Sequence, residues 1–305
     1  MLLDIAVLKE IFSVDCVYVG NKSLTFNGIN TVYDAVEGQI AWIKPNVKNN
    51  AEILSNTNAS CIICNEETFN LGNSEKQRLY VISKDPKLEY FKVLKHIRNS
   101  TNKKPLSAIH ETAIVDKNCI IGKNVTIGAY SVIGSCTIGD NTQIGEFVKI
   151  FDSVTIGANV LIRENVSIGG EGFGFYTHSD GTVEHIPHIG SVKIGNNVQI
   201  FPFANIDRGT LGSTEIGNGS VIDHYVHVGH NSKIGESTIV CANSVLAGGS
   251  KINNRCFIGV NTLLKEKCEI GSDSITGIGA VVVKNIPDSE VWVGNPAKFL
   301  KKNEK

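Results

Sequence analysis

The chain has 305 residues, a formal net charge of −1, and 42% hydrophobic and 19% charged residues. This near-neutral balance excludes a general electrostatic attraction to nucleic acid or to an anionic membrane surface. The sequence has no recognisable signal peptide and no apolar run near the ~20 residues of a membrane span, so we expect a cytoplasmic protein without an integral membrane segment. The eight cysteines are scattered, and we expect reduced thiols rather than disulfides or zinc ligands.

Residues 1–100 predict a small α/β domain without any repeat. Apolar runs indicate strands at 14–19, 39–43, 59–64 and 78–82, and the segments between them indicate helices at 49–55 and 88–97. A polar stretch follows and ends at Pro105, which is typical of a linker, and we place this linker at 101–109.

A six-residue repeat occupies residues 110–285. Its longest register carries apolar residues six positions apart at Ile216, Ile222, Val228, Ile234, Val240, Leu246, Ile252, Ile258, Leu264 and Ile270. A helix repeats its apolar stripe about every 3.6 residues, whereas an alternating strand places residues six apart on one face. The glycine and asparagine between them suit tight corners. The pattern therefore predicts short strands wound into a three-sided coil of about 18 residues, with the apolar residues stacked inside.

Two segments interrupt this repeat. Residues 170–192 insert a glycine- and aromatic-rich segment, which we expect to form a loop on the binding side of the coil. Residues 286–305 should close the last coil with a turn and a basic tail. The glycines of the insert do not lead from a strand into a helix, so they do not predict a dinucleotide site.

The hexad resembles that of the hexapeptide-repeat acyltransferases. This resemblance implies a left-handed parallel β-helix, preceded here by the small α/β domain, and assembly into a homotrimer. It also implies a thioester acyl donor and no permanently bound cofactor. A solenoid without catalysis, which binds sugar nucleotide or acts as a scaffold, is the alternative.

Three segments resemble one family within that group. Gly170 to Gly190, Asp207-Arg208-Gly209-Thr210 and Val228-Gly229-His230-Asn231 are similar to segments of the UDP-3-O-(3-hydroxyacyl)glucosamine N-acyltransferases of lipid A biosynthesis. More weakly, 39–43 and 57–60 resemble the uridine-binding domain of that family. The resemblance implies that a 3-hydroxyacyl group moves from acyl carrier protein to the amine of a UDP-linked acylglucosamine.

The sequence departs from this family at three places. Lys267 stands where the family has a second active-site histidine, and the second aromatic residue of the family's uracil site falls near Lys48. The chain stops at 294–298 in the manner of sugar N-acetyltransferases of surface-polysaccharide pathways, whereas the family continues with a helix that helps to dock acyl carrier protein. These departures favour an alternative activity, the acyl-CoA-dependent acylation of another nucleotide-linked amino sugar.

Three residues are candidates for the chemistry itself. The resemblance assigns the catalytic base to His230, since an amine that attacks a thioester must lose a proton near neutral pH. Gly248 lies one coil further along and should stack above His230, where its N–H could bind an oxyanion, although it could also be a plain corner glycine. Asp223 matches a family acid linked to the histidine and would orient the imidazole; the alternative is a solvated corner residue.

Four residues are candidates for substrate contacts. Phe173 and Phe175 would pack on the sugar or acyl chain, or would only anchor the insert. Trp42 would stack on uracil, or would belong to the core of a strand. Lys267 would contact a phosphate of the donor, or would be an ordinary surface lysine.

Two more histidines lie close to His230 in the sequence. His224 and His227 stand six and three residues before it, a spacing that also occurs in metal sites. Residues three apart in a flat strand point to opposite faces, so His227 should not join His230 in binding an ion. We therefore predict no metal site, and we expect His227 to shape the substrate groove.

Overall fold

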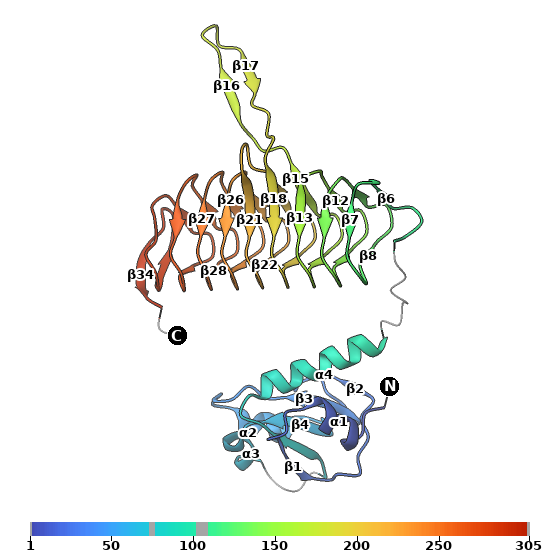
Figure 1. Ribbon diagram of the computed structural model, residues 1–305. Coiled ribbons are helices and arrows are strands. Elements are labelled where there is room, and N and C mark those ends of the chain that lie inside the picture. Colours follow the sequence, from blue (N-terminus) through green and yellow to red (C-terminus); the bar gives the residue numbers. More distant parts are fainter. Residues whose placement is uncertain (1, 73–76, 102–108, 304–305) are drawn as a thin grey trace. The chain divides into compact units, whose positions relative to one another are not determined.

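The computed structural model describes residues 2–72, 77–101 and 109–303 (Figure 1). The chain divides into two compact units, Met1–Pro105 and Leu106–Lys305. Most of the linker predicted at 101–109 lies outside the described residues. No helix in the described ranges is long and apolar enough to cross a membrane.

The first unit is a small α/β fold, as the sequence predicts, but its sheet has five strands where four were expected. The strand order is β1-β5-β4-β3-β2, with β1 antiparallel to β5 and the other pairs parallel. The strands are β1 (Val17–Gly20), β2 (Gly28–Ile29), β3 (Gln39–Trp42), β4 (Cys61–Cys64) and β5 (Leu79–Ile82). The helices are α1 (Ile5–Ile11), α2 (Asn50–Asn56), α3 (Glu66–Asn70) and α4 (Pro86–Thr101).

The elements that sequence analysis missed in this unit are short. Helix α1 has seven residues, of which only Leu8 is buried, so it presents no clear apolar stripe. Its start is marked by Asp4, whose side chain accepts a hydrogen bond from the Val7 N–H at 2.9 Å. Strand β2 and helix α3 are likewise too short to show a period.

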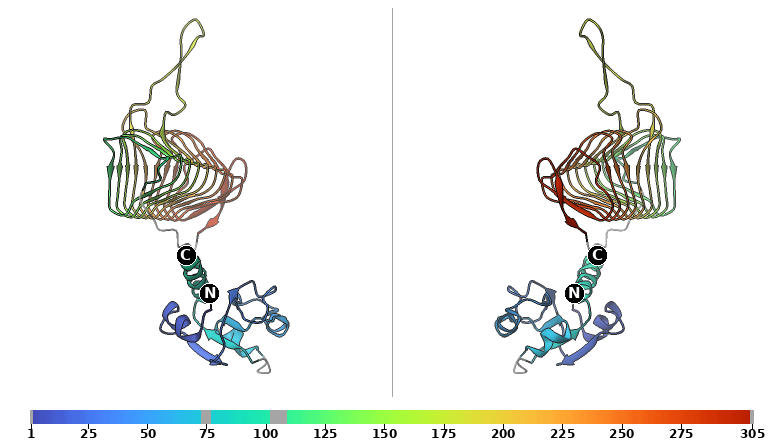
Figure 2. Two further views of the ribbon diagram at one scale, coloured as in Figure 1. Left: turned by 90° about the vertical axis from the view of Figure 1, so that its right-hand side faces the viewer. Right: turned by 90° about the vertical axis from the view of Figure 1, so that its left-hand side faces the viewer.

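The second unit is a parallel β-helix of three sheets, which confirms the predicted fold class (Figures 1 and 2). Sheet 1 contains β7 (Ile120–Ile121), β10 (Thr137–Ile138), β13 (Val154–Ile156), β18 (Ser191–Ile194), β21 (Ser213–Ile216), β24 (Lys233–Ile234), β27 (Lys251–Ile252) and β30 (Glu269–Ile270). Sheet 2 contains β8 (Thr126–Ile127), β11 (Gln143–Ile144), β14 (Leu161–Ile162), β19 (Gln199–Ile200), β22 (Val221–Ile222), β25 (Ile239–Val240), β28 (Phe257–Ile258), β31 (Ile275–Thr276), β33 (Glu290–Val293) and β34 (Lys298–Lys302). Sheet 3 contains β6 (Ile114–Val115), β9 (Val132–Ile133), β12 (Lys149–Ile150), β15 (Ser167–Gly170), β20 (Asn205–Asp207), β23 (His227–Val228), β26 (Val245–Leu246), β29 (Leu263–Leu264) and β32 (Val281–Val282).

The apolar residue of each hexad points into the coil and stacks on its equivalents. Ile162 pairs with Ile200, and Ile200 pairs with Ile222 in the next coil, and all three are buried. The corners between strands have positive φ, and asparagine occupies many of them because its short polar side chain tolerates this conformation. These corner residues include Asn124, Asn141, Asn159, Asn165, Asn197, Asn231, Asn243 and Asn261.

Two irregularities distinguish this β-helix from a uniform solenoid. The insert expected as a loop at 170–192 contains an antiparallel hairpin, β16 (Phe175–Thr177) and β17 (Val183–His185), which projects from the coil between β15 and β18 (Figure 1). In addition, Asn205 in β20 pairs with His227 in β23, so this coil has 22 residues instead of the 18 that separate His227 from Val245.

Candidate functional site

The base of the insert covers one corner of the β-helix, where His230 follows β23. A Cβ placed on Gly172 would lie 3.0 Å from the His230 Cβ and 3.2 Å from its Cδ2, so the insert backbone packs directly on this side chain. His188, which is buried, packs from the same insert, and its ring centroid lies 5.0 Å from that of His230. His230 is therefore partly buried beneath a lid that the sequence predicted only as a loop.

Asn231 fixes the orientation of the His230 ring. The Asn231 Oδ1 accepts a hydrogen bond from the Thr210 N–H at 3.0 Å, and its Nδ2 donates to the Leu211 carbonyl at 2.5 Å. The same Oδ1 lies 3.1 Å from the His230 Nδ1. An amide oxygen can only accept, and the Thr210 Oγ1, 3.3 Å from the same Nδ1, can accept as well, so both contacts fit a proton on Nδ1 and a lone pair on Nε2. This is the tautomer that a general base requires.

Gly248 stacks on His230, as the coil length predicts. A Cβ placed on Gly248 would lie 2.7 Å from the His230 Cε1 and 2.9 Å from its Cδ2, and would be closer still to Nε2. The backbone continues the stack, since the Gly249 N–H donates to the His230 carbonyl at 2.7 Å. Within the described residues, the Gly248 N–H has no hydrogen-bond acceptor. The stacking of Gly248 on His230 is as expected, and an N–H without an acceptor is compatible with the oxyanion role, which stays a prediction.

Asp207 is a buried acid that sequence analysis did not assign. Its Oδ1 accepts from Asn205 Nδ2 at 2.6 Å, and its Oδ2 lies 3.6 Å from the His227 Nε2. Burial raises the pKa of this carboxyl, while His227, Asn205 and then His230 oppose the rise. The lengthened coil displaces Asp207 from the 18-residue register, which explains why spacing did not reveal it.

Asp223 does not contact His230 within the described chain. Its Oδ1 lies 2.7 Å from the His224 Nδ1, and its Oδ2 accepts from the Ala242 N–H at 3.1 Å. Burial acts to raise the pKa of Asp223, but the hydrogen bonds from His224 and Ala242 outweigh it and hold the pKa below its usual range. The two residues lie apart because Asp223 follows a strand of sheet 2 and His230 follows a strand of sheet 3.

The three neighbouring histidines have separate surroundings. His227 pairs with Asn205 and Asp207, whereas His224 pairs with Asp223 and packs against Phe201 at 5.3 Å between ring centroids. No potential metal cluster in the described part of the chain includes any of His224, His227 and His230.

The other predicted contacts lie on the insert and along the coil. Phe173 and Phe175 are exposed and pack edge-to-face on one another at 4.6 Å. Lys267 is exposed on the coil beyond Gly248, and its N–H donates to the Gly248 carbonyl at 3.2 Å. Both phenylalanines are therefore open to a ligand, and Lys267 is a charge that continues the His230–Gly248 column.

Trp42 lines a pocket in the first unit. The cavity measures about 340 Å³, and Tyr33 and Tyr90 also line it. The rings of Trp42 and Tyr90 are 6.1 Å apart and tilted by 38°. Two tyrosines thus accompany Trp42, although the sequence position expected for a second aromatic residue is close to Lys48. Tyr33 precedes Trp42 by only nine residues, whereas Tyr90 lies on α4 and is brought to the pocket only by the fold.

Comparison with known proteins relates the β-helix to acyltransferases. A family model for bacterial transferase hexapeptide repeats matches residues 135–170 and 213–248. The UDP-3-O-acylglucosamine N-acyltransferase of Methylococcus capsulatus is 35% identical over 133 residues, which cover 44% of this chain and 38% of that protein. The enzyme of the same name from Thermosynechococcus vestitus is 46% identical over 85 residues, which cover 28% of this chain and 25% of that protein. The chain thus matches about two fifths or less of the length of these relatives.

Solved structures of similar fold cover more of the chain. The UDP-N-acetylglucosamine O-acyltransferase of Moraxella catarrhalis has a TM-score of 0.60 and 29% identity, covering 64% of this chain and 75% of that one. The Francisella novicida UDP-N-acetylglucosamine acyltransferase has a TM-score of 0.59 and 30% identity, covering 64% and 70%. With its hexads and its three parallel sheets, the chain belongs to the hexapeptide-repeat acyltransferases.

Proposed function

We propose that this chain is an N-acyltransferase that moves a 3-hydroxyacyl group from acyl carrier protein to the amine of a UDP-linked acylglucosamine, as in lipid A biosynthesis. The observation that carries the proposal is the close packing of the His230 imidazole, at its Nε2 edge, on Gly248, whose N–H has no acceptor among the described residues. The names of the curated relatives support the amine and the UDP-sugar as acceptor.

Each side chain has a defined role in this reaction. The His230 Nε2 accepts a proton as the amine nitrogen attacks the thioester carbon. The Gly248 N–H donates to the oxyanion of the tetrahedral intermediate. When the intermediate collapses, the C–S bond breaks and His230 returns the proton to the leaving thiolate, so no cofactor is consumed. Asn231 holds the ring in the required tautomer, and the buried Asp207 stabilises positive charge on the neighbouring imidazoles.

Substrate contacts complete the proposal. The exposed pair Phe173 and Phe175 would pack on the sugar or the acyl chain, and His227 would line the groove beside Asp207. In the first unit, Trp42 with Tyr33 and Tyr90 offers aromatic surface for a planar base such as uracil.

A second candidate is transfer from an acyl-CoA to a simpler nucleotide-linked amino sugar for a surface polysaccharide. The exposed Lys267 favours it, because a lysine beyond Gly248 replaces a neutral imidazole with a permanent charge for a phosphate of the donor. Both donors carry the acyl group on phosphopantetheine, so the roles of His230 and Gly248 are the same in the two reactions.

A donor screen with purified protein tests the proposal. The acceptors are UDP-3-O-(3-hydroxyacyl)glucosamine and a simple UDP-amino sugar, and each is combined with 3-hydroxyacyl carrier protein or acetyl-CoA. We expect turnover with the acylated sugar and the carrier protein, and a ~10²–10⁴-fold loss in His230→Ala. His110→Ala is the matched control, since His110 is exposed and, among the described residues, its side chain hydrogen-bonds only with Thr112.

The other outcomes decide between the alternatives. Turnover with acetyl-CoA and the simple sugar alone would reject the lipid A reaction in favour of the second candidate. Binding of UDP-sugar without turnover under any combination, unchanged in His230→Ala, would leave a non-catalytic solenoid.

A further inference from the structure

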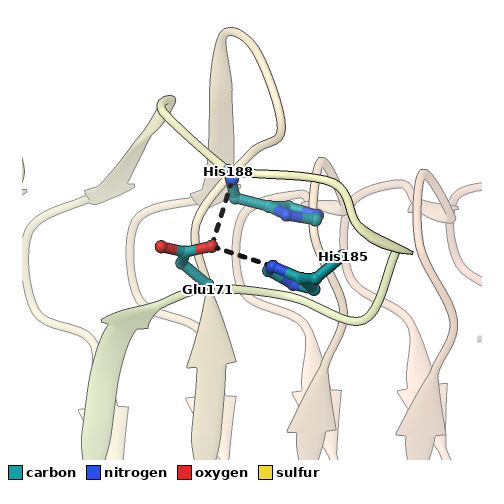
Figure 3. A group of neighbouring side chains, drawn as sticks. All are labelled: Glu171, His185 and His188. Atoms are coloured by element: carbon teal, nitrogen blue, oxygen red, sulfur yellow. Dashed lines mark hydrogen bonds and ion pairs between the residues drawn. The ribbon is translucent and has the colours of Figure 1, made fainter. Parts of the chain in front are cut away.

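Three side chains with metal-binding chemistry meet at the base of the hairpin in the insert (Figure 3). They are Glu171, which follows β15, His185, which ends β17, and His188. One potential ligand atom from each lies within 4.8 Å of those from the other two. Glu171 thus lies on the outgoing side of the hairpin base, and the two histidines lie on the returning side.

His185 and Glu171 present lone pairs to each other. The His185 Nε2 lies 3.1 Å from the Gly172 carbonyl, which can only accept, so Nε2 carries the ring proton. The His185 Nδ1 is then unprotonated, and it faces the Glu171 Oε2 at 3.5 Å. Two acceptors at this separation repel each other unless a cation, or a second proton on the ring, lies between them.

His188 also has an unprotonated ring nitrogen, and this one is buried. Its Nδ1 lies 2.8 Å from the Ile186 carbonyl, so Nδ1 carries the proton and Nε2 does not. The side chain is 3% exposed, and its Nε2 has no hydrogen-bond partner among the described residues. A buried polar atom without a protein partner is uncommon in native proteins, and a bound ion or water is a usual explanation.

The donor set indicates which class of ion fits. Two imidazoles and one carboxylate are a usual set for zinc and other divalent first-row transition metals, and three protein ligands leave a position open. Each imidazole donates its other N–H to a backbone carbonyl, which is the outer-shell arrangement of metal-bound histidines. Hard ions such as magnesium prefer an all-oxygen set, which this cluster lacks.

We propose that Glu171, His185 and His188 bind one divalent transition-metal ion, with zinc as the best match. The ion would join the two sides of the hairpin base and hold the insert closed over the corner of His230, whose ring packs on that of His188. This proposal does not depend on the acyl-transfer reaction, because metal binding can be measured without any substrate.

Calorimetric titration of the metal-free, full-length protein without a histidine tag is the test. We expect one equivalent of Zn²⁺ to bind, with affinity at least ~10-fold weaker in His185→Ala and in Glu171→Gln. His178→Ala is the control: His178 pairs with Glu184 at 3.0 Å on the same hairpin, without a third ligand, so its loss should leave affinity unchanged. His185 and Glu171 are exposed, so circular dichroism should show that both variants keep the fold.

Cobalt spectroscopy distinguishes this site from the cysteines. Cys119 and Cys136 lie with their sulfur atoms 3.4 Å apart and offer the main competing soft-ligand pair. Co²⁺ bound to the proposed site should show no thiolate-to-metal charge-transfer band. Such a band, or equal affinity in wild type and His185→Ala, would overturn the proposal, as would the absence of binding.

Discussion

At the scale of single residues, the site depends on the contact between the His230 imidazole and the backbone of the next coil. Gly248 has no room for a side chain, because a Cβ there would overlap the edge of the His230 ring. Its φ is not in the left-handed region, so alanine is compatible with the backbone at this position. Steric exclusion of the imidazole, and not strain in the coil, should therefore dominate the effect of a substitution.

Gly248→Ala should lower kcat by about 10²–10³-fold through displacement of His230 and disturbance of the oxyanion donor. In the His230→Ala background the same substitution should cost far less, because the ring that clashes is absent. A kinetic double-mutant cycle measures this difference. Additive losses in the two single variants would show that Gly248 acts independently of His230.

Asp207→Asn should change the pH dependence of stability. Burial raises the pKa of Asp207, so the folded state holds this proton to higher pH than the unfolded state does. Binding of the proton therefore stabilises the fold at low pH. This contribution is lost as the pH rises from about 4 through the raised pKa. The asparagine variant has no such loss. The thermal midpoint of Asp207→Asn, relative to that of wild type, should therefore increase as the pH rises.

Asp180→Asn provides the comparison, since hydrogen bonds from Thr182 hold the pKa of this exposed carboxyl below its usual range. The thermal midpoint of Asp180→Asn, relative to that of wild type, should not increase as the pH rises. A gap between Asp207→Asn and wild type that stays constant from pH 4 to neutrality, within about half a degree, would contradict the prediction.

At the scale of elements, the parts that repeat were predictable and the parts that break the repeat were not. The hexad positions of residues 216–270 are buried as predicted, because period six leaves only one face for the core. The stacking of Gly248 on His230 follows from the same regularity. Asp207 and His188 escaped prediction because a 22-residue coil and the return path of a hairpin have no period from which a position can be read.

The role of Asn231 illustrates a different limit. Its place beside His230 is plain in the sequence, but its function depends on which way the amide points. That orientation is set by Thr210 and Leu211, which are 20 and more residues away in sequence. Side-chain hydrogen bonds across neighbouring coils thus carry information that spacing alone does not contain.

At the scale of the whole molecule, exposed aromatic residues form a candidate surface for association between copies of the chain. Tyr130 stacks on Phe147, and Phe203 stacks on Tyr225, at 5.2 and 4.9 Å between ring centroids. All four lie at positive-φ corners of the β-helix and are exposed in the single chain. Apolar patches of this kind on a folded surface mark protein interfaces.

We expect a homotrimer in solution, with a mass three times the 32.9 kDa of the chain, held in part by these aromatic corners. Light scattering after gel filtration measures the mass. Phe203→Glu should lower it by placing a charge in the contact, whereas Phe173→Glu on the hairpin should not. A monomeric wild type, or a trimer unaffected by Phe203→Glu, would contradict this assembly.

The antiparallel strand β34 at one end of the β-helix affects whether a second molecule can add to that end by strand pairing. Strand β34 runs opposite to β33 and covers its edge, and all of its residues are exposed, including Lys298, Lys301 and Lys302. An uncovered parallel edge would accept the first coil of another molecule as readily as its own next coil. The reversed strand does not match the direction that such an addition requires, and exposed lysines on an edge strand disfavour pairing with another strand. At this edge of sheet 2, β34 therefore leaves no parallel strand edge to which a coil of another molecule could add.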